Sequence, residues 1–402
     1  MRTPSVKSPA LWHKDISLSA VTAGLVAVVV GFASSVAIVF QAATAAGATP
    51  AIIASWLLAL GIGMGLTCAV LSWYYKAPVI TAWSTPGAAL LVTGLSGLSI
   101  GEATGVFIFS ALLMLITGLS GWFDKLTRHI PLPLASAMLA GILLQFGLNI
   151  FTSLSQQLLL TGGMCLTYLL ARRLLPRYTI LLVLMAGLLL ALTQQQLDLS
   201  AVSVTLTSPV WVWPEWSLSA LIGTGIPLFI VTMASQNIPG IAVMRASGYN
   251  TPVSPLISWT GLTTLLLAPL GAFSVNLAAI TAAICTGEEA HPSPEKRYIA
   301  GISAGIFYLL SGLFGATVVA LFAAFPVAMV ATLAGLALLG TIGASLASAT
   351  ADAKYREAAI VTLLVTVSGI SFFNIASAFW GIIAGVITLL FINGLRGKQQ
   401  HA

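Results

Sequence analysis

The sequence ITAWSTPGAALLVTG, residues 80–94, interrupts a long apolar run with the segment WSTPG, residues 83–87. Proline is accepted in the first turn of a helix, where its missing N–H is not needed. Backbone that is not helical is tolerated at membrane depth only where protein or a water-filled cavity surrounds it. The stretch therefore predicts a broken membrane span whose helical part begins near Thr85, with a cavity at its start.

The composition places the whole chain in a membrane. Of its 402 residues, 58% are hydrophobic and 6% are charged, and the mean hydropathy is +1.02. A soluble domain carries about 25% charged residues, so this chain could not cover a water-exposed surface. Its apolar runs are long, which predicts spanning helices and not the short alternating segments of a β-barrel. We expect an all-α polytopic protein with fourteen spans, near residues 17–43, 51–74, 79–97, 102–121, 133–150, 156–171, 178–195, 218–240, 253–270, 274–287, 298–322, 326–346, 358–372 and 374–394.

The placement of charge predicts the orientation of these spans. With the N-terminus inside, all sixteen lysine and arginine residues fall on the inner side, as the positive-inside rule requires. An even number of spans then puts both termini in the cytoplasm. The net charge of +6 follows from this orientation and calls for no nucleic-acid partner. The three cysteines lack metal-ligand or disulfide spacing, so no metal and no other cofactor is expected.

The two halves of the chain, residues 1–200 and 201–402, repeat each other. Three matches carry the repeat: segments 82–84 and 272–274 at a shift of 190, segments 118–121 and 312–315 at 194, and segments 33–34 and 234–235 at 201. Seven spans per half is an odd number, so the second copy enters the membrane from the opposite side. Inverted repeats are typical of transporters whose site lies near the midplane on broken helices. The matched spans three and ten therefore favour a pair of half-helices over the alternative, a proline kink in an ordinary span.

The ionisable residues indicate the charge of the ligand. All ten acidic residues and all four histidines fall at span ends or in loops. A cationic substrate would need a carboxylate at membrane depth. An anion can instead be held by backbone N–H groups at two half-helix N-termini, each contributing about 0.3–1 kcal/mol. We therefore expect a small organic anion.

Polar and aromatic residues at membrane depth are the candidate ligand contacts. They are Ser34, Ser35 and Gln41 in span one, Trp83, Ser84, Thr85 and Gly87 in span three, Gln236 and Asn237 in span eight, and Phe273, Ser274 and Asn276 in span ten. For Ser34 and Ser35 there are two equal explanations: small residues that allow close helix packing, or contact with the ligand. The adjacent amides of span eight are costly to bury in lipid, which favours a binding role. Trp83 and Phe273, matched in the repeat, are expected to form walls for a flat apolar ligand.

Three segments resemble the benzoate:proton symporter (BenE) family: PVITAWSTPGAALL (78–91), VTMASQNIPGIAVMRASGYN (231–250) and SVNLAAITAAICTGEEAHP (274–292). That family is similar in architecture to uracil permeases and sulfate-type anion exchangers. The resemblance implies a core domain of spans 1–4 and 8–11, a gate domain of spans 5–7 and 12–14, and an elevator movement between them. It also implies a ligand site between the starts of spans three and ten, against span eight. Uracil permeases carry carboxylates in spans eight and ten, where this chain has Gln236, Asn237 and Asn276.

The resulting hypothesis is a secondary active transporter of the bacterial inner (plasma) membrane that imports an aromatic carboxylate such as benzoate with a proton. An anion uniporter or exchanger of the sulfate-transporter type is the alternative, and a homodimer is left open. An intramembrane enzyme is disfavoured because the spans hold no Ser-His, paired Asp, Cys-His or metal-ligand cluster. An ion channel would give the matched aromatic residues no role.

The carrier of the proton is a separate question. With no acid or histidine in the spans, we expect the substrate to carry it, because a desolvated pocket raises the pKa of a carboxylic acid. Glu288 and Glu289, near the inner end of span ten, are the rival carriers. We expect both to lie in a solvated loop.

Overall fold

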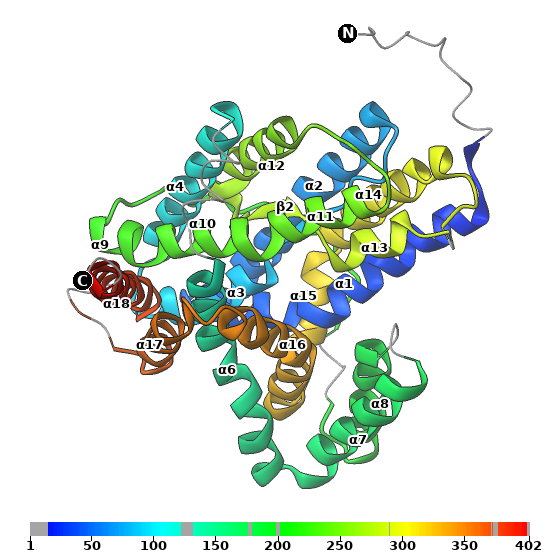
Figure 1. Ribbon diagram of the computed structural model, residues 1–402. Coiled ribbons are helices and arrows are strands. Elements are labelled where there is room, and N and C mark those ends of the chain that lie inside the picture. Colours follow the sequence, from blue (N-terminus) through cyan, green and yellow to red (C-terminus); the bar gives the residue numbers. More distant parts are fainter. Residues whose placement is uncertain are drawn as a thin grey trace, which may run out of the picture.

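The computed structural model describes residues 15–121, 132–175, 179–197, 202–288, 290–370, 372 and 377–399, and these fold almost entirely into helices (Figure 1). In the first half the elements are α1 (Leu18–Ala45), α2 (Pro50–Tyr75), β1 (Thr81–Trp83), α3 (Thr85–Gly94), α4 (Ile100–Leu119), α6 (Leu132–Gln156), α7 (Leu158–Leu174) and α8 (Thr179–Thr193). In the second half they are α9 (Leu218–Ala220), η3 (Leu221–Gly225), α10 (Ile226–Thr232), η4 (Met233–Asn237), α11 (Ile238–Ala246), α12 (Val253–Leu267), η5 (Ala268–Leu270), β2 (Val275–Leu277), α13 (Ile280–Thr286), η6 (Pro294–Lys296), α14 (Tyr298–Leu313), α15 (Gly315–Ala323), α16 (Val327–Thr350), α17 (Arg356–Val367) and α18 (Ser377–Gln399).

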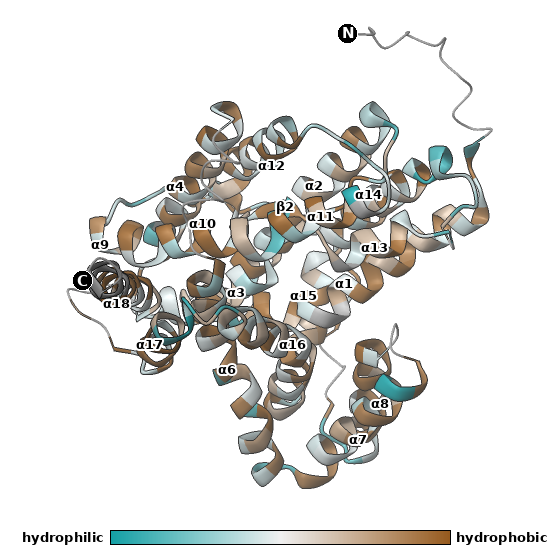
Figure 2. Cartoon of the chain, viewed as in Figure 1, coloured by the Kyte–Doolittle hydropathy of each residue, from teal (hydrophilic) through white to brown (hydrophobic). Residues whose placement is uncertain are grey.

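The helices have the length and composition of membrane spans. Six described segments qualify on these two criteria: Pro50–Tyr75, Ile100–Leu119, Leu132–Gln156, Leu218–Arg245, Val253–Leu270 and Val327–Thr350. The number rises to eight if each of two bent helix pairs counts as one span. Apolar residues run along nearly every helix, as Figure 2 shows. The chain is thus a multi-pass integral membrane protein, as predicted.

Fewer helices meet the length criterion for a span than the fourteen spans expected from the apolar runs. The reason is that several of those runs fold into two or more short elements. The runs predicted as spans three and ten contain only short helices, α3 and α13, each preceded by a strand. Another run is divided where α14 meets α15 at an angle of 62°. Helices α8 and α17, of 15 and 12 residues, are also too short for the length criterion.

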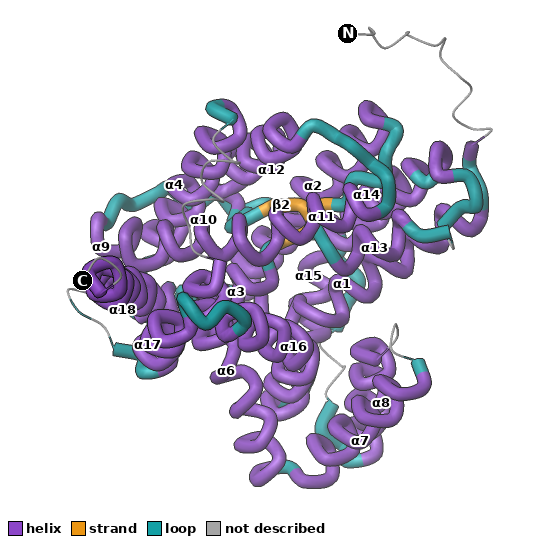
Figure 3. Tube along the Cα trace, viewed as in Figure 1, coloured by secondary structure: helices purple, strands orange, loops and turns teal. Residues whose placement is uncertain are grey.

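A two-stranded sheet lies among the helices, drawn in orange in Figure 3. Strands β1 and β2 are antiparallel, with Thr81 opposite Leu277, Ala82 opposite Asn276 and Trp83 opposite Val275. Both strands are largely buried. Each strand leads into a half-helix, β1 into α3 and β2 into α13, so the pair fixes where the two half-helices begin.

Helices of the first half of the chain pack along helices of the second half. Helix α2 packs along α14, and α4 packs along α12. The α2–α14 contact is close because glycines face each other: a Cβ added to Gly61 would lie 2.6 Å from the Cα of Gly312. Small residues of this kind let membrane helices approach closely without a polar contact. Helices α6 and α16 form a second long contact outside this group.

Candidate substrate-binding site

Three polar side chains of α2 hold the first strand in place. The Thr67 and Thr81 hydroxyl groups are 2.6 Å apart, and the Thr81 N–H donates to the Cys68 sulfur over 3.1 Å. The Ser72 hydroxyl accepts from the Val79 N–H and donates to the Val79 carbonyl oxygen. These bonds satisfy backbone groups that a three-residue strand cannot pair by itself, which is necessary at membrane depth.

The second strand is held in the same way, from α12 and from η4. The Val275 N–H donates to the Thr264 hydroxyl over 2.9 Å, and the Leu277 N–H donates to Asn237 Oδ1 over 3.0 Å. The hydrogen-bond network orients the buried Asn276 amide so that it accepts from the Ser84 N–H at 3.0 Å and donates to the Leu277 carbonyl oxygen at 3.1 Å. Both asparagines therefore serve the backbone of the strand pair.

The two half-helices begin differently. In α3 the Ser84 hydroxyl accepts from the Gly87 N–H at 2.9 Å, and Pro86 occupies the first turn, so most of the N-terminal donors are already used or missing. Helix α13 starts after Ala279 and has no side-chain cap. The N–H groups at a helix start without a side-chain cap are satisfied by other backbone groups, by water or by a ligand.

A central cavity of about 180 Å³ lies beside the strand pair and both half-helix starts. Its lining comes from α1 (Val30, Gly31, Ser35), α2 (Met64), β1 and α3 (Ala82, Trp83, Thr85, Pro86), η4 (Ser235, Gln236), the start of α13 (Ala278, Ala279, Thr281), α14 (Tyr308) and α16 (Ala337, Leu338, Thr341). No aspartate, glutamate, histidine, lysine or arginine is among these described lining residues. The central cavity is therefore mostly apolar and carries neutral polar groups only.

Trp83 forms a fixed aromatic wall of this cavity. Its indole Nε1 donates to the Ser35 hydroxyl at 2.8 Å, and Ser35 in turn donates to the Gly31 carbonyl oxygen at 2.7 Å. The ring of Phe32 meets the Trp83 ring edge-on, with centroids 4.7 Å apart. Because its polar atom and one of its faces are both engaged, the Trp83 ring is held in one orientation and offers the cavity an apolar surface.

Some polar side chains reach the cavity without a hydrogen bond to the described part of the protein, Gln236 and Thr281 among them. Gln236 lies in the π-helical turn η4, and the described residues provide no hydrogen bond to its amide. Thr281 lies in the first turn of α13, and its buried Oγ1 has no hydrogen-bond partner among the described residues. Single π-turns occur often at functional sites. Both groups are available to a ligand.

The structure brings together only part of the predicted residue set. Ser35, Trp83, Thr85 and Gln236 line the central cavity. Of the others, Asn276 lies in β2, Ser274 directly precedes β2, Ser84 and Gly87 form the α3 cap, and Asn237 of η4 binds the backbone of β2; none of the five is among the lining residues. Gln41 lies on α1 away from the lining, and the side chain of Ser34 is outside the described residues.

The expected pair of aromatic walls needs correction, because Phe273 does not line the cavity. It is fully buried against Trp56 and Phe107, with ring centroids 6.3 and 6.1 Å away. The match at a shift of 190 had placed it opposite Trp83. In the strand pair Trp83 lies opposite Val275. Thr281, which was not predicted to bind ligand, does line the cavity.

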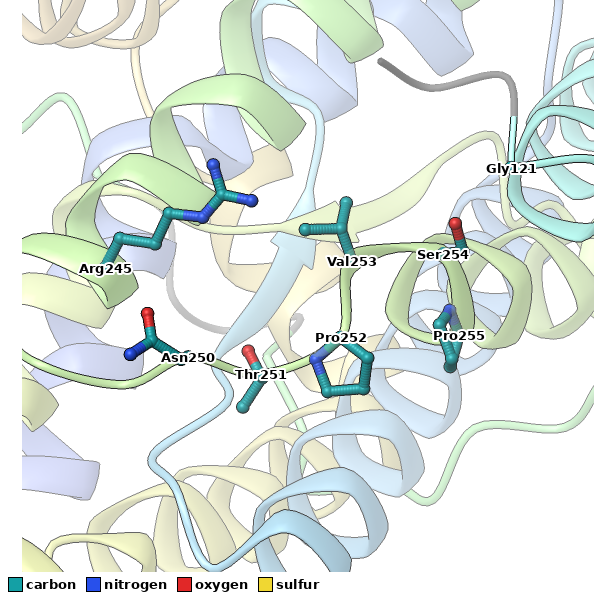
Figure 4. Close-up of a pocket in the computed structure, with 8 residues that line it drawn as sticks. All are labelled: Gly121, Arg245, Asn250, Thr251, Pro252, Val253, Ser254 and Pro255. Atoms are coloured by element: carbon teal, nitrogen blue, oxygen red, sulfur yellow. The ribbon is translucent and has the colours of Figure 1, made fainter. Parts of the chain in front are cut away.

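Other cavities lie away from the strand pair. Figure 4 shows a pocket of about 380 Å³ lined by Gly121, Arg245 and residues 250–255, none of which was predicted to bind ligand. A wider pocket of about 750 Å³ opens between the end of α3 and helices α6, α17 and α18. Neither pocket contains the half-helix starts or a fixed aromatic wall, so the central cavity is the candidate substrate site.

Known structures with the same fold include membrane transporters. The transmembrane domain of a cyanobacterial bicarbonate transporter, BicA, matches with a TM-score of 0.60 and 12% identity, covering 92% of this chain and 97% of that one. The overall structure of SLC26A9 matches with a TM-score of 0.64 and 11% identity, covering 96% of this chain and 67% of that one. At such low identity the likeness defines the fold alone. The class is therefore a helical membrane protein with a transporter fold.

The chain belongs to the BenE family. The family model described as benzoate membrane transport protein matches residues 14–391. The inner membrane protein YdcO of Escherichia coli (strain K12) is 48% identical over 94% of this chain and 97% of its own length. The benzoate membrane transport protein of Acinetobacter baylyi is 41% identical over 93% of this chain and 95% of its own. The family comprises membrane transporters, which confirms the resemblance and the prediction that the chain is not an enzyme.

The contact between Asn237 and β2 gives a first prediction. Asn237→Leu should lower the free energy of unfolding by about 1–3 kcal/mol, because it leaves the buried Leu277 N–H without a partner. Thermal unfolding of the detergent-purified protein measures this, with Asn250→Leu in an exposed loop as the control. If the variant has unchanged stability but no longer binds substrate, Asn237 is a binding residue and does not stabilise the strand pair.

Proposed function

We propose that this protein is a secondary active transporter that imports a benzoate-like aromatic carboxylate together with a proton. The observation that carries the proposal is the central cavity, with its fixed Trp83 wall, free neutral polar groups and no charged residue in its described lining. Its volume of about 180 Å³ suits one aromatic ring, since an apolar cavity of about 150 Å³ in another protein binds benzene. The names of the family and of one relative support the same substrate class.

The carboxylate would bind at the start of α3. Thr85 and Gln236 both line the cavity there, and the described residues provide no hydrogen bond to either side chain. A carboxylate accepts about four hydrogen bonds, so an amide N–H, a hydroxyl and a backbone N–H can share it. The positive end of α3 adds a favourable field. The ring would then lie against Trp83.

The proposed architecture is a seven-plus-seven inverted repeat of residues 1–200 and 201–402. The strand pair supports it, since β1 and β2 each precede a half-helix and start 275 − 81 = 194 residues apart, the shift found for another match in the sequence. The reciprocal packing of α2 on α14 and of α4 on α12 supports it as well. In this scheme α3 and α13 are the broken parts of spans three and ten of fourteen.

The same scheme divides the molecule into a core domain, spans 1–4 and 8–11, and a gate domain, spans 5–7 and 12–14. The core supplies most of the cavity lining, and the gate supplies Ala337, Leu338 and Thr341 of α16. A site shared in this way would open to alternate sides if the core slid against α16, which is an elevator movement. In this proposal both termini lie in the cytoplasm, which the distribution of lysine and arginine supports. A homodimer belongs to the same proposal, and crosslinking in native membranes tests it.

Proton coupling would proceed through the substrate. The described cavity lining has no acid or histidine to carry a proton, while a desolvated site favours the neutral form of a carboxylic acid. Moving the anion and a proton together is thermodynamically the same as moving the neutral acid. Glu288 follows the C-terminal end of α13 and is exposed, and Glu289 lies outside the described residues.

This leads to a prediction for the two acids. Glu288→Gln and Glu289→Gln, singly or together, should retain accumulation of substrate driven by a pH gradient in proteoliposomes, because neither carries the coupled proton. Equilibrium exchange of substrate serves as the control for protein function. Loss of accumulation in the double variant with exchange intact would assign coupling to the protein.

The alternative function is an anion uniporter or exchanger of the sulfate-transporter type, which the lack of a described protonatable cavity residue favours. The two functions differ in substrate selectivity. We expect unlabelled benzoate to inhibit uptake of labelled benzoate strongly and sulfate to inhibit it weakly, since a doubly charged hydrated ion has no countercharge in the described lining. Competition by sulfate at concentrations similar to those of benzoate would favour the exchanger.

A further inference from the structure

Thr281 presents an unsatisfied polar group to the central cavity. Its side chain is 6% exposed, and its Oγ1 has no hydrogen-bond partner among the described residues. The Tyr308 hydroxyl lies near Thr281, since both side chains approach Gly31. Leaving a buried hydroxyl without a partner is unfavourable, and native proteins keep few such groups. A ligand in the cavity is the available partner.

Gly31 of α1 packs closely beside the Thr281 side chain. A Cβ added to Gly31 would lie 3.3 Å from the Tyr308 hydroxyl and 3.5 Å from Thr281 Cγ2. All three residues line the cavity. The glycine therefore lets α1 lie close to these two side chains at the cavity wall.

Thr281 and the proposed carboxylate position lie on different half-helices. Thr85 is in the first turn of α3, Thr281 is in the first turn of α13, and both residues line the cavity. A ligand whose carboxylate binds at Thr85 would therefore direct the far side of its ring toward α13, where Thr281 lies.

We propose that the site selects an aromatic carboxylate with a hydroxyl group at the meta or para position, and that Thr281 binds this hydroxyl. The proposal rests on the proposed function and names its substrate class more closely. Unsubstituted benzoate has only carbon and hydrogen on the side of the ring facing Thr281. An ortho hydroxyl lies beside the carboxylate and cannot reach it. A meta or para hydroxyl can donate to or accept from Thr281 Oγ1.

The test compares ligands of similar size in competition binding to the purified protein. The probes are 3- and 4-hydroxybenzoate, the corresponding methylbenzoates, 2-hydroxybenzoate and benzoate. Wild-type protein should bind the better of the two hydroxybenzoates about tenfold or more tightly than its methyl analogue, because the methyl group leaves the Thr281 hydroxyl unpaired. In Thr281→Val this hydroxyl-to-methyl ratio should fall to about one or below, and in Thr281→Ser it should be largely retained.

A matched control is available on the same helix. Thr286→Val makes the same substitution at the end of α13, where the hydroxyl donates to the Ala283 carbonyl oxygen and does not line the cavity. It should keep the wild-type ratio. If wild-type protein binds benzoate but shows no hydroxyl preference, or if Thr281→Val weakens all the ligands equally, the inference is overturned and the proposed function stands. If no aromatic carboxylate binds, the proposed function fails and this inference fails with it.

Discussion

Gln236→Leu should weaken benzoate binding about 10- to 150-fold while the protein remains folded. The Gln236 amide lines the central cavity, and the described residues give it no hydrogen bond. A hydrogen bond to a charged group contributes about 1.5–3 kcal/mol, which corresponds to that loss of affinity. Leucine is close to glutamine in size and removes only the polar head. Calorimetric titration of the purified variant with benzoate measures the change.

The chain supplies a matched control in Gln41→Leu. Gln41 was also a candidate from the sequence, but it lies on α1 outside the cavity lining. This variant should bind benzoate as the wild-type protein does. If Gln41→Leu loses binding and Gln236→Leu retains it, the ligand lies elsewhere along α1 and the central cavity is not the site.

Ala337→Trp should reduce transport to the level of empty liposomes. Ala337 lines the cavity from α16, and an indole there would occupy much of the roughly 180 Å³ that a ligand needs. The substitution changes no charge and no hydrogen bond in the described structure. Uptake of labelled benzoate into proteoliposomes, normalised to inserted protein, is the measurement.

The control for this substitution is Ala347→Trp, on the exposed side of the same helix. A tryptophan there faces the surroundings of the protein, so uptake should stay near the wild-type rate. Normal uptake by Ala337→Trp would show that substrate passes by another route, for which the pocket between α3 and α6 would be the next candidate.

The sequence predicted the membrane class and the interruption at residues 83–87, because proline, glycine and small polar residues seldom follow one another inside an apolar run unless the helix is broken there. It did not predict the strand pair. Strands of three residues have no visible period, and their hydrogen bonds come from distant partners such as Thr67 and Asn237. The two π-turns of the α9–α11 segment likewise leave no pattern in the sequence.

The predicted binding residues coincide only in part with the residues that line the cavity, for a related reason. Asn237 and Asn276 are buried amides of the kind that often bind ligands. In the structure their side chains instead form hydrogen bonds with backbone groups at the short strands. Phe273 was matched to Trp83 by similarity of side chains, but it is buried against Trp56 and Phe107, and Trp83 lies opposite Val275 in the strand pair. Thr281 was overlooked because its hydroxyl is informative only once its neighbours are known.

The most direct test of the central claim is uptake of labelled benzoate into proteoliposomes with and without an imposed pH gradient. With the outside acidic, wild-type protein should accumulate benzoate above the external concentration, collapse of the gradient should release it, and Ala337→Trp should show neither effect. Absence of protein-dependent benzoate uptake, or equal accumulation by Ala337→Trp, would contradict transport of an aromatic carboxylate through the central cavity.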